Sequence, residues 1–357
     1  MSRNERDYKD SLFDSLGIAN KEKIHTQFLS WFFNSANINN RIKIKFLSKI
    51  LDNQPIDEAN NSEITAITEY ESIDLIIIIK DKNFCIQCIF AFENKLKSTL
   101  HSDQLAKYNE VLKVNFNNID THKFLLSLIE EPNPNDWNSL LYEKLLEIFE
   151  DKDLLDQING DDKVFIAEYI KTLNNLLLAK SEFFKRPDDF KDILVVKKSD
   201  LNKYTESSKL SDKHCAFVAK YQLGTIFMMN FIREKFKYII KSKKYEFKET
   251  HGHPLLDIVL IEYDKYILQF QYQNLTVKLQ LISIGGAALS ECLISKFKSL
   301  KDVIGYEKIN EAKNNKKNYI SLSKKIEENY SELGINVLTE FDYINNKVKK
   351  IETSLEL

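Results

Sequence analysis

The sequence predicts an α/β protein, with a central mixed β-sheet flanked by helices and a C-terminal α+β region. Three observations lead to this class. The apolar run Leu75–Ile79 is rich in β-branched residues, as expected of a strand that is buried on both faces. Segments with apolar residues at helical spacing surround it. Hydrophobic residues make up 43% of the 357 residues, which supplies a substantial core and excludes global disorder.

Length and composition bound the organisation of the chain. At about 150 residues per domain, the length predicts two domains, which we place at residues 1–185 and 186–357. Four cysteines are too few for a disulfide framework, the longest apolar run is far too short to span a bilayer, and the charged N-terminus lacks the apolar stretch of a signal peptide. We therefore expect a soluble, cytoplasmic protein that does not associate with a membrane.

The elements of the first half follow from the spacing of apolar residues. Ile24, Phe28 and Phe32 share one face of a helix, whereas strands are predicted where apolar residues alternate or run together. In chain order we expect helices over residues 20–34 and 40–52, strands over 63–70, 73–80 and 84–92, a helix over 102–114, a strand over 123–129, and helices over 138–150 and 162–182.

The second half is predicted by the same criteria. We expect long helices over 211–241, strands over 255–263, 266–274 and 277–284, a helix near 287–299, and a polar, largely helical tail over 311–350. Gly285 and Gly286 are typical of a tight turn between the last strand and its helix. No motif in this half indicates a reaction, so its expected role is substrate binding or dimerisation.

Three charged residues are predicted to gather at one edge of the sheet. Asp74 opens the apolar strand, and Glu93 and Lys95 end the strand that follows it. Two strands joined by a short turn pair antiparallel, so the start of one lies beside the end of the other. Residues two apart in a strand point to the same face. The side chains of Glu93 and Lys95 should therefore project together, next to Asp74.

This combination of charges suits a metal ion. Two buried carboxylates repel each other, and burying either one unpaired is costly. A divalent cation removes both costs, and carboxylate oxygens suit Mg²⁺ or Mn²⁺. Such a metal polarises a phosphoryl oxygen and activates a water, while a lysine stabilises the charge of the transition state, as the hydrolysis of a phosphodiester requires. The alternative interpretation is an ordinary charged strand end, since Glu-x-Lys is common by chance.

A nearby helix connects these residues to a known family. Gln104 and Tyr108 lie four residues apart and share a helix face. Asp74, the Glu93-x-Lys95 pair and this Gln-x-x-x-Tyr helix resemble the core of the PD-(D/E)XK nuclease superfamily, and the helix is similar to that of its RecB-like members. Further similarities to a bacterial branch of the superfamily lie in the segments Glu22–Phe32, Trp137–Tyr142 and Glu168–Ile170.

The resemblance implies a restriction-endonuclease-like fold and a role for each site residue. It implies metal ligation by Asp74, Glu93 and Glu22 (Glu22 directly or through water), catalysis by Lys95, and support of the site or contact with DNA by Gln104 and Tyr108. The sequence departs from the family pattern at Ile73, which replaces the proline of the first motif. Asn94 fills the variable position between Glu93 and Lys95, where we expect no chemical effect.

By the same resemblance we expect a Mg²⁺-dependent deoxyribonuclease, with Mn²⁺ as substitute metal, that acts as a homodimer in bacterial defence. Residues 1–160 hold 18 Lys and Arg against 26 Asp and Glu, whereas the remaining residues hold 33 against 27. The basic second part favours contact with nucleic acid. Two alternatives stay open: a non-catalytic nucleic-acid-binding protein on the same fold, and an RNA-cleaving toxin.

Overall fold

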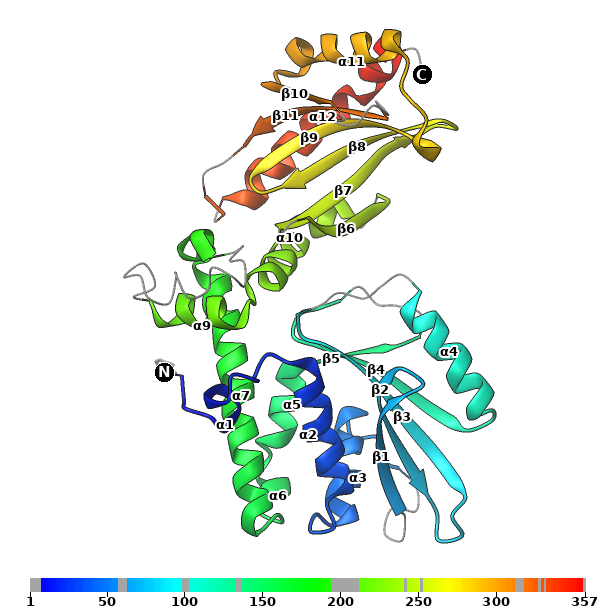
Figure 1. The fold of residues 1–357 in the computed structure, drawn as a ribbon, viewed down its shortest axis with the longest axis vertical. Helices are drawn as coiled ribbons and strands as arrows, with labels where there is room; N and C mark the ends of the chain where they lie inside the picture. Colours follow the sequence, from blue (N-terminus) through cyan, green and yellow to red (C-terminus); the bar gives the residue numbers. More distant parts are fainter. Residues whose placement is uncertain are drawn as a thin grey trace. The chain divides into compact units, whose positions relative to one another are not determined.

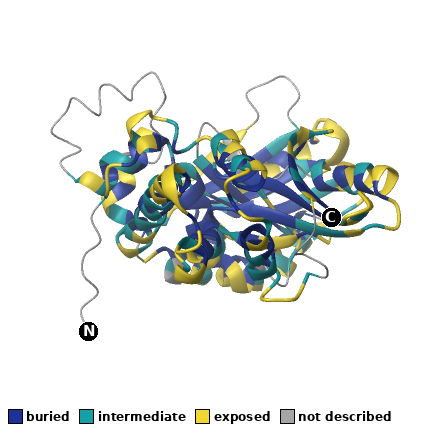
Figure 2. Cartoon of the chain, turned by 90° about the horizontal axis from the view of Figure 1, so that it is seen from below, coloured by how far each residue is buried: buried dark blue, intermediate teal, exposed yellow. Residues whose placement is uncertain are grey.

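The computed structural model describes residues 8–56, 63–97, 103–131, 136–193, 212–240, 243–250, 253–311, 318–326, 329–330 and 332–355. Contacts divide the chain into two units, Met1–Ser181 and Glu182–Leu357. The division lies near the end of the long helix α7 (Gly160–Lys185), close to the boundary that we placed at residue 185. Each unit has its own sheet, and the central strands of both sheets are mostly buried, whereas edge strands, helices and loops carry exposed residues (Figure 2).

The first unit is built on a mixed sheet of five strands in the order β1-β2-β3-β4-β5. Its strands are β1 (Glu63–Tyr70), β2 (Ile73–Lys80), β3 (Ile86–Lys95), β4 (Asp120–Ser127) and β5 (Asn138–Leu141). The pairs β1–β2 and β2–β3 are antiparallel, whereas β3–β4 and β4–β5 are parallel. The predicted α/β class with a mixed central sheet is thus confirmed, and β1 and β2 have the predicted bounds.

Helices cover both faces of this sheet (Figure 1). The helices of the first unit, besides α7, are α1 (Leu12–Ser15), α2 (Glu22–Asn34), α3 (Asn40–Ile50), α4 (Gln104–Asn115), α5 (Tyr142–Phe149) and α6 (Lys152–Leu155). Helix α4 lies on one side of the sheet, and α2, α3, α5 and α7 lie on the other. This explains why every residue from Leu75 to Ile79 is buried, as predicted.

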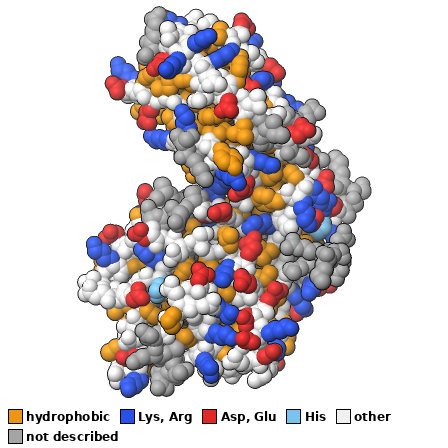
Figure 3. Space-filling model, turned by 180° about the vertical axis from the view of Figure 1, so that it is seen from behind, with side chains coloured by type: hydrophobic (Ala, Val, Ile, Leu, Met, Phe, Trp, Pro, Cys, Tyr) orange, Lys and Arg blue, Asp and Glu red, His pale blue; other side chains and the backbone are white. Residues whose placement is uncertain are grey.

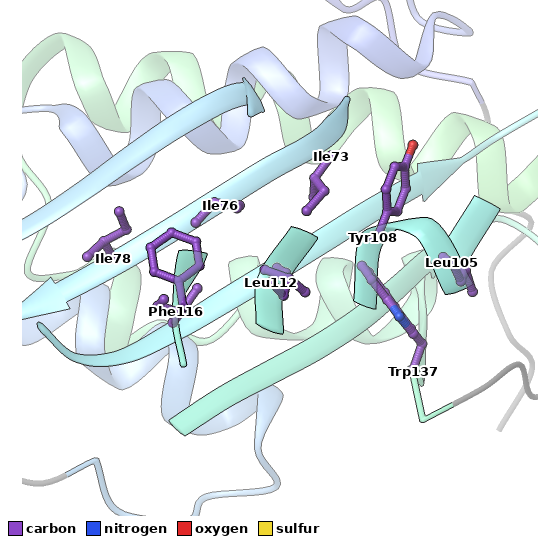
Figure 4. Close-up of a cluster of buried hydrophobic side chains, with 10 residues drawn as sticks. Ile73, Ile76, Ile78, Leu105, Tyr108, Leu112, Phe116 and Trp137 are labelled. Carbon is purple, nitrogen blue, oxygen red and sulfur yellow. The ribbon is translucent and has the colours of Figure 1, made fainter. Parts of the chain in front are cut away.

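Each helical layer has its own apolar core. Between α4 and the sheet, the side chains of Leu105, Tyr108 and Leu112 form one buried cluster with Ile73 and Ile76 of β2 (Figure 4). On the other side the core is aromatic, with ring contacts among Phe28, Phe32, Phe46, Phe149 and Tyr169. Burial of this apolar surface holds the helices against the sheet and fixes the ends of β2 and β3.

One prediction for the first unit was wrong in its first residues. The helix expected over 138–150 begins only at Tyr142, because Asn138–Leu141 forms β5. These four residues pair with Phe124–Ser127 of β4. That strand lies outside the segment 138–150 whose apolar spacing predicted the helix. Parallel pairing of this kind depends on a neighbouring strand, and the spacing of apolar residues within the segment does not reveal it.

The second unit contains an antiparallel sheet of six strands in the order β10-β11-β9-β8-β7-β6. Its strands are β6 (Tyr245–Thr250), β7 (His253–Glu262), β8 (Tyr266–Gln273), β9 (Thr276–Ser283), β10 (Lys308–Glu311) and β11 (Tyr319–Lys325). Its helices are η2 (Pro187–Ile193), α9 (Lys213–Tyr221), α10 (Gly224–Ile240), η5 (Ile284–Gly286), α11 (Glu291–Ile304) and α12 (Leu333–Leu355). The apolar face of the sheet packs against α10 and α12 through the ring contacts Phe236–Tyr272 and Phe270–Phe341.

Several predictions for the second unit needed correction. The tail expected to be largely helical over 311–350 contains the strand β11, which pairs with β9. The long helices expected over 211–241 meet at a break where Gln222 adopts a left-handed backbone conformation. Among the described residues no single helix could cross a membrane. Helices α9 and α10 reach the necessary length and apolar composition only together, and they are bent by 104° at their junction.

Charge is mixed on the surface. On the face shown in Figure 3, acidic and basic side chains are interspersed over both units. The difference in net charge between the two halves of the sequence therefore does not form a surface of a single sign on that face.

Candidate active site

The ends of β2 and β3 bring two predicted acidic residues together. The strands pair antiparallel with Leu75 opposite Phe92, which places Asp74 beside Glu93. The Oδ2 atom of Asp74 accepts a hydrogen bond from the backbone N–H of Asn94 at 2.8 Å. Asp74 is half-buried, whereas Glu93 is only 1% exposed. The two carboxylates are neighbours at one end of the sheet, as the spacing predicted.

Lys95 and Gln104 hold one oxygen of the Glu93 carboxylate. Glu93 and Lys95 point to the same side of β3, and Lys95 Nζ lies 2.7 Å from Glu93 Oε1. Gln104, the first residue of α4, donates from Nε2 to the same Oε1 at 2.7 Å. It also donates to the hydroxyl oxygen of Tyr108 at 2.8 Å. The Gln-x-x-x-Tyr pair therefore reaches the acidic residues through Glu93.

Glu22 approaches from a different element, the first turn of α2. Its Oε1 accepts the backbone N–H groups of Leu96 at 2.8 Å and of Lys97 at 3.0 Å. These bonds fix the chain directly after Lys95. We refer to the carboxylates of Glu22, Asp74 and Glu93 as the acidic cluster, since the charge of Glu22 contributes to the raised pKa of both Asp74 and Glu93.

Burial disfavours the charged forms of Asp74 and Glu93. Burial is the main cause that raises the pKa of Glu93 from 4.5 to about 7, and the charge of Asp74 is the next. Burial likewise raises the pKa of Asp74, and the charge of Glu22 adds to both shifts. Among the described residues, the buried Oε2 atom of Glu93 has no partner at hydrogen-bond geometry, although the side chains of Asp74 and Tyr108 approach the Glu93 carboxylate. The cluster therefore costs stability, which is typical of a functional site.

The family of the first unit follows from a comparison with models of protein families, which match residues 10–185 to the PD-(D/E)XK nuclease superfamily. This part of the chain belongs to the PD-(D/E)XK nuclease superfamily. The resemblance predicted from the motifs is thus confirmed, while its RecB-like detail at Gln104 and Tyr108 stays a prediction. Residues 186–357 lie outside the match. Comparisons with curated proteins and with solved structures gave no significant match.

The superfamily implies a divalent cation, and the donor chemistry of the cluster fits one. The buried Oε2 of Glu93 is an anionic oxygen that a cation would satisfy, and a cation would offset the repulsion between Glu93 and Asp74. In the part of the chain that the structure describes, no three acidic, His or Cys side chains already converge as a metal site. Glu22 is engaged with backbone N–H groups. Asp74 Oδ2 is engaged with such a group as well, so this contact does not separate the two residues; Asp74 and Glu93 fit direct ligation because they are neighbours at the end of the sheet.

Asn94 has contacts that the sequence did not reveal. It fills the variable position of the nuclease motif, where we expected no chemical effect. Its Nδ2 donates to the backbone oxygen of Glu22 at 2.9 Å and to Thr26 Oγ1 at 3.4 Å, and its Oδ1 accepts from the hydroxyl of Tyr142 at 2.7 Å. One side chain thus joins β3 to α2 and α5. No local sequence signal distinguishes this asparagine from any other.

His25 has a structural role next to this network. Its Nε2 lies 2.8 Å from the backbone oxygen of Ala19, and because a carbonyl only accepts, Nε2 carries the hydrogen. Its Nδ1 then accepts from the hydroxyl of Tyr169 at 3.0 Å. Burial lowers the pKa of His25 to about 4, so the imidazole is neutral at pH 7. His25 and Tyr169 both lie in segments that resemble the superfamily, and they pack α2 against α7.

Proposed function

We propose that the first unit is a metal-dependent nuclease that hydrolyses phosphodiester bonds in DNA, with Mg²⁺ as cofactor and Mn²⁺ as substitute. The observation that carries this proposal is the environment of Glu93. One oxygen of its buried carboxylate is held by Lys95 and Gln104, and the other has no partner at hydrogen-bond geometry in the described part of the chain. With Asp74 beside it, this arrangement is unfavourable by itself and becomes favourable when a cation binds.

Asp74 and Glu93 would hold the metal. When bound, it supplies a polarised phosphoryl oxygen and a water of lowered pKa. Glu22 would complete the metal shell, directly or through water. Its Oε1 fixes the backbone after Lys95, and its charge strengthens the negative field around the two ligands.

Lys95 would be the catalytic lysine. Its ammonium group is 2.7 Å from Glu93 Oε1 and the residue is 9% exposed, so the charge is held in place before a substrate arrives. A preorganised ammonium can orient the attacking water or stabilise the charge that develops on the phosphoryl oxygens. The Glu93 carboxylate would thus have two roles: it would contribute to the metal site, and it would orient the ammonium group of Lys95.

Gln104 and Tyr108 would support the site. Gln104 Nε2 fixes the Glu93 carboxylate, and the Tyr108 hydroxyl accepts the second hydrogen of the same amide nitrogen. Tyr108 is buried in the core under α4 (Figure 4). These contacts favour support over direct contact with DNA, the two roles that the resemblance left open.

Removal of the metal should abolish the activity. The purified full chain is expected to cleave duplex DNA with Mg²⁺ or Mn²⁺, to lose all cleavage in EDTA, and to recover it when Mg²⁺ is restored, because the cluster cannot activate water without a cation. Linear, circular and single-stranded DNA and RNA serve as parallel substrates in a gel assay. Cleavage of RNA alone would identify a ribonuclease, and binding without cleavage would identify a non-catalytic nucleic-acid-binding protein. Cleavage that persists in EDTA contradicts the metal site.

We further propose that the nuclease acts as a homodimer in bacterial defence. The family resemblance of the sequence supports this proposal. The basic composition of the second part of the chain supports a role of that part in substrate binding or dimerisation. We expect light scattering on the full chain at working concentration to give twice the monomer mass of 41.8 kDa. A strict monomer that still cleaves DNA contradicts the dimer and leaves the nuclease proposal intact.

A further inference from the structure

Asn94 occupies a central place in the geometry of the acidic cluster. It lies between Glu93 and Lys95 in β3, so its side chain points to the opposite side of the strand from theirs. The backbone N–H of Asn94 binds Asp74 Oδ2, and its side chain binds the backbone oxygen of Glu22. A single residue therefore contacts two members of the cluster and is covalently bonded to the third.

These contacts form a closed circuit of hydrogen bonds. Asn94 Nδ2 binds the backbone of Glu22, and the side chain of Glu22 returns to the backbone N–H groups of Leu96 and Lys97. The circuit therefore locks the first turn of α2 to the last residues of β3. Any displacement of the Asn94 side chain would move Glu22 relative to Lys95.

Tyr142, in a third element, restrains the side chain of Asn94. Its hydroxyl, at the first residue of α5, donates to Asn94 Oδ1 at 2.7 Å. Both residues are buried, with exposed fractions of 0% for Tyr142 and 2% for Asn94. The T-shaped contact of the Tyr142 ring with His25 restrains the ring as well. The amide of Asn94 is thus fixed on both its donor and its acceptor side.

We propose that Asn94 is a positioning residue of the nuclease, which sets the relative placement of Glu22, Asp74 and the Glu93–Lys95 pair, and that Tyr142 acts through it. The inference rests on the proposed function of the site. A catalytic arrangement must be held to within a fraction of an ångström, and residues behind metal ligands commonly change metal affinity or activity 10- to 100-fold when they are replaced. Asn94 has the contacts of such a residue, although it touches neither metal nor substrate.

The test compares Asn94→Ala and Tyr142→Phe with the wild type. The readouts are kcat and KM on linear duplex DNA at saturating Mg²⁺, and the dissociation constant of Mn²⁺ from calorimetry without DNA. For Asn94→Ala we expect kcat to fall about 100-fold and Mn²⁺ binding to weaken at least about 10-fold, with little change in KM. Tyr142→Phe removes one oxygen and should show the same changes at about 10-fold. The double variant should be no worse than Asn94→Ala, because Tyr142 acts through Asn94.

Asn175 supplies the matched control. It is also a 2% exposed asparagine, and it ties α7 to the backbone of Lys9 and to Asp14. Asn175→Ala should lower the melting temperature while kcat and Mn²⁺ affinity stay within about twofold of wild type. Equal losses of kcat and Mn²⁺ affinity in Asn175→Ala and Asn94→Ala would overturn this inference and leave the proposed function intact. So would an Asn94→Ala variant with the kcat and Mn²⁺ affinity of wild type. If Asn94→Ala fails to fold, Tyr142→Phe decides by the same readouts. A wild type that neither cleaves nor binds Mn²⁺ overturns the proposed function, and this inference with it.

Discussion

Replacing Lys95 with alanine is expected to lower the rate of DNA cleavage by about 10³-fold, with little change in the affinity for DNA. The reason is that Lys95 Nζ is the positive charge held directly against Glu93, the predicted metal ligand, at 2.7 Å from its Oε1. An ammonium fixed in this way acts on the charge of the transition state more than on the bound ground state, so its loss should appear in kcat. Single-turnover cleavage of linear duplex DNA with Mg²⁺ measures this step.

Two further variants make the Lys95 result specific. Lys95→Met keeps the aliphatic stem that packs in the buried site, so it should be as inactive as Lys95→Ala while it disturbs the fold less. Lys80→Ala removes a lysine at the opposite end of β2, where it lies 3.7 Å from Glu63, and should cleave at the wild-type rate. If Lys95→Met retains full activity, the chemistry lies elsewhere in the chain and our assignment of the site is wrong.

The parts of the fold that the sequence predicted well are those where the pattern is local. The run Leu75–Ile79 is short, rich in β-branched residues and has no polar side, which favours a strand covered on both faces, and the predicted bounds of β2 were correct. The β2–β3 pair follows from a short turn, and it alone brings Asp74 next to Glu93. The core of the candidate site was predictable because it is built from one pair of adjacent strands.

The predictions that failed concern structure that depends on contacts with other segments of the chain. The strand β5 forms because β4 lies beside it, and β11 forms because it pairs with β9. The polar composition of the segment that contains β11 does not predict this pairing. The contacts of Asn94 with Glu22 and Tyr142 cross from β3 to helices that precede and follow it in the chain. The state of Glu93 also requires the structure, since burial rather than sequence neighbours is the main cause of its raised pKa.

Replacing Glu93 with glutamine should abolish cleavage and, at the same time, stabilise the metal-free first unit. The pKa of Glu93 is raised from 4.5 to about 7, which corresponds to about 3 kcal/mol of stability lost when the buried group ionises. Glutamine cannot ionise but also forms no ion pair with Lys95. We therefore expect a net gain in the free energy of unfolding of about 1–3 kcal/mol at pH 8 in EDTA.

The gain in stability from Glu93→Gln should increase with pH. A carboxyl whose folded pKa is raised binds its proton more tightly in the folded state, so its contribution to stability is complete below pH 4.5 and is lost as the pH rises through about 7. Wild type and Glu93→Gln should therefore differ least near pH 5 and most at pH 8. Urea unfolding followed by tryptophan fluorescence measures the difference in the full chain, because both tryptophans, Trp31 and Trp137, lie in the first unit.

Added Mg²⁺ separates a metal ligand from a merely buried acid. Binding of Mg²⁺ to the folded state should stabilise wild type at pH 8 and leave Glu93→Gln unchanged, since the variant lacks the anionic oxygen that would hold the ion. Asp257 in the second unit is a matched control: burial raises its pKa too, and Gln271 binds it at 2.7 Å. Asp257→Asn should keep wild-type cleavage and the wild-type response of tryptophan fluorescence to Mg²⁺. A Glu93→Gln variant that is stabilised by Mg²⁺ as strongly as wild type would show that the cation binds without Glu93. The destabilising charge at Glu93 would then need another explanation.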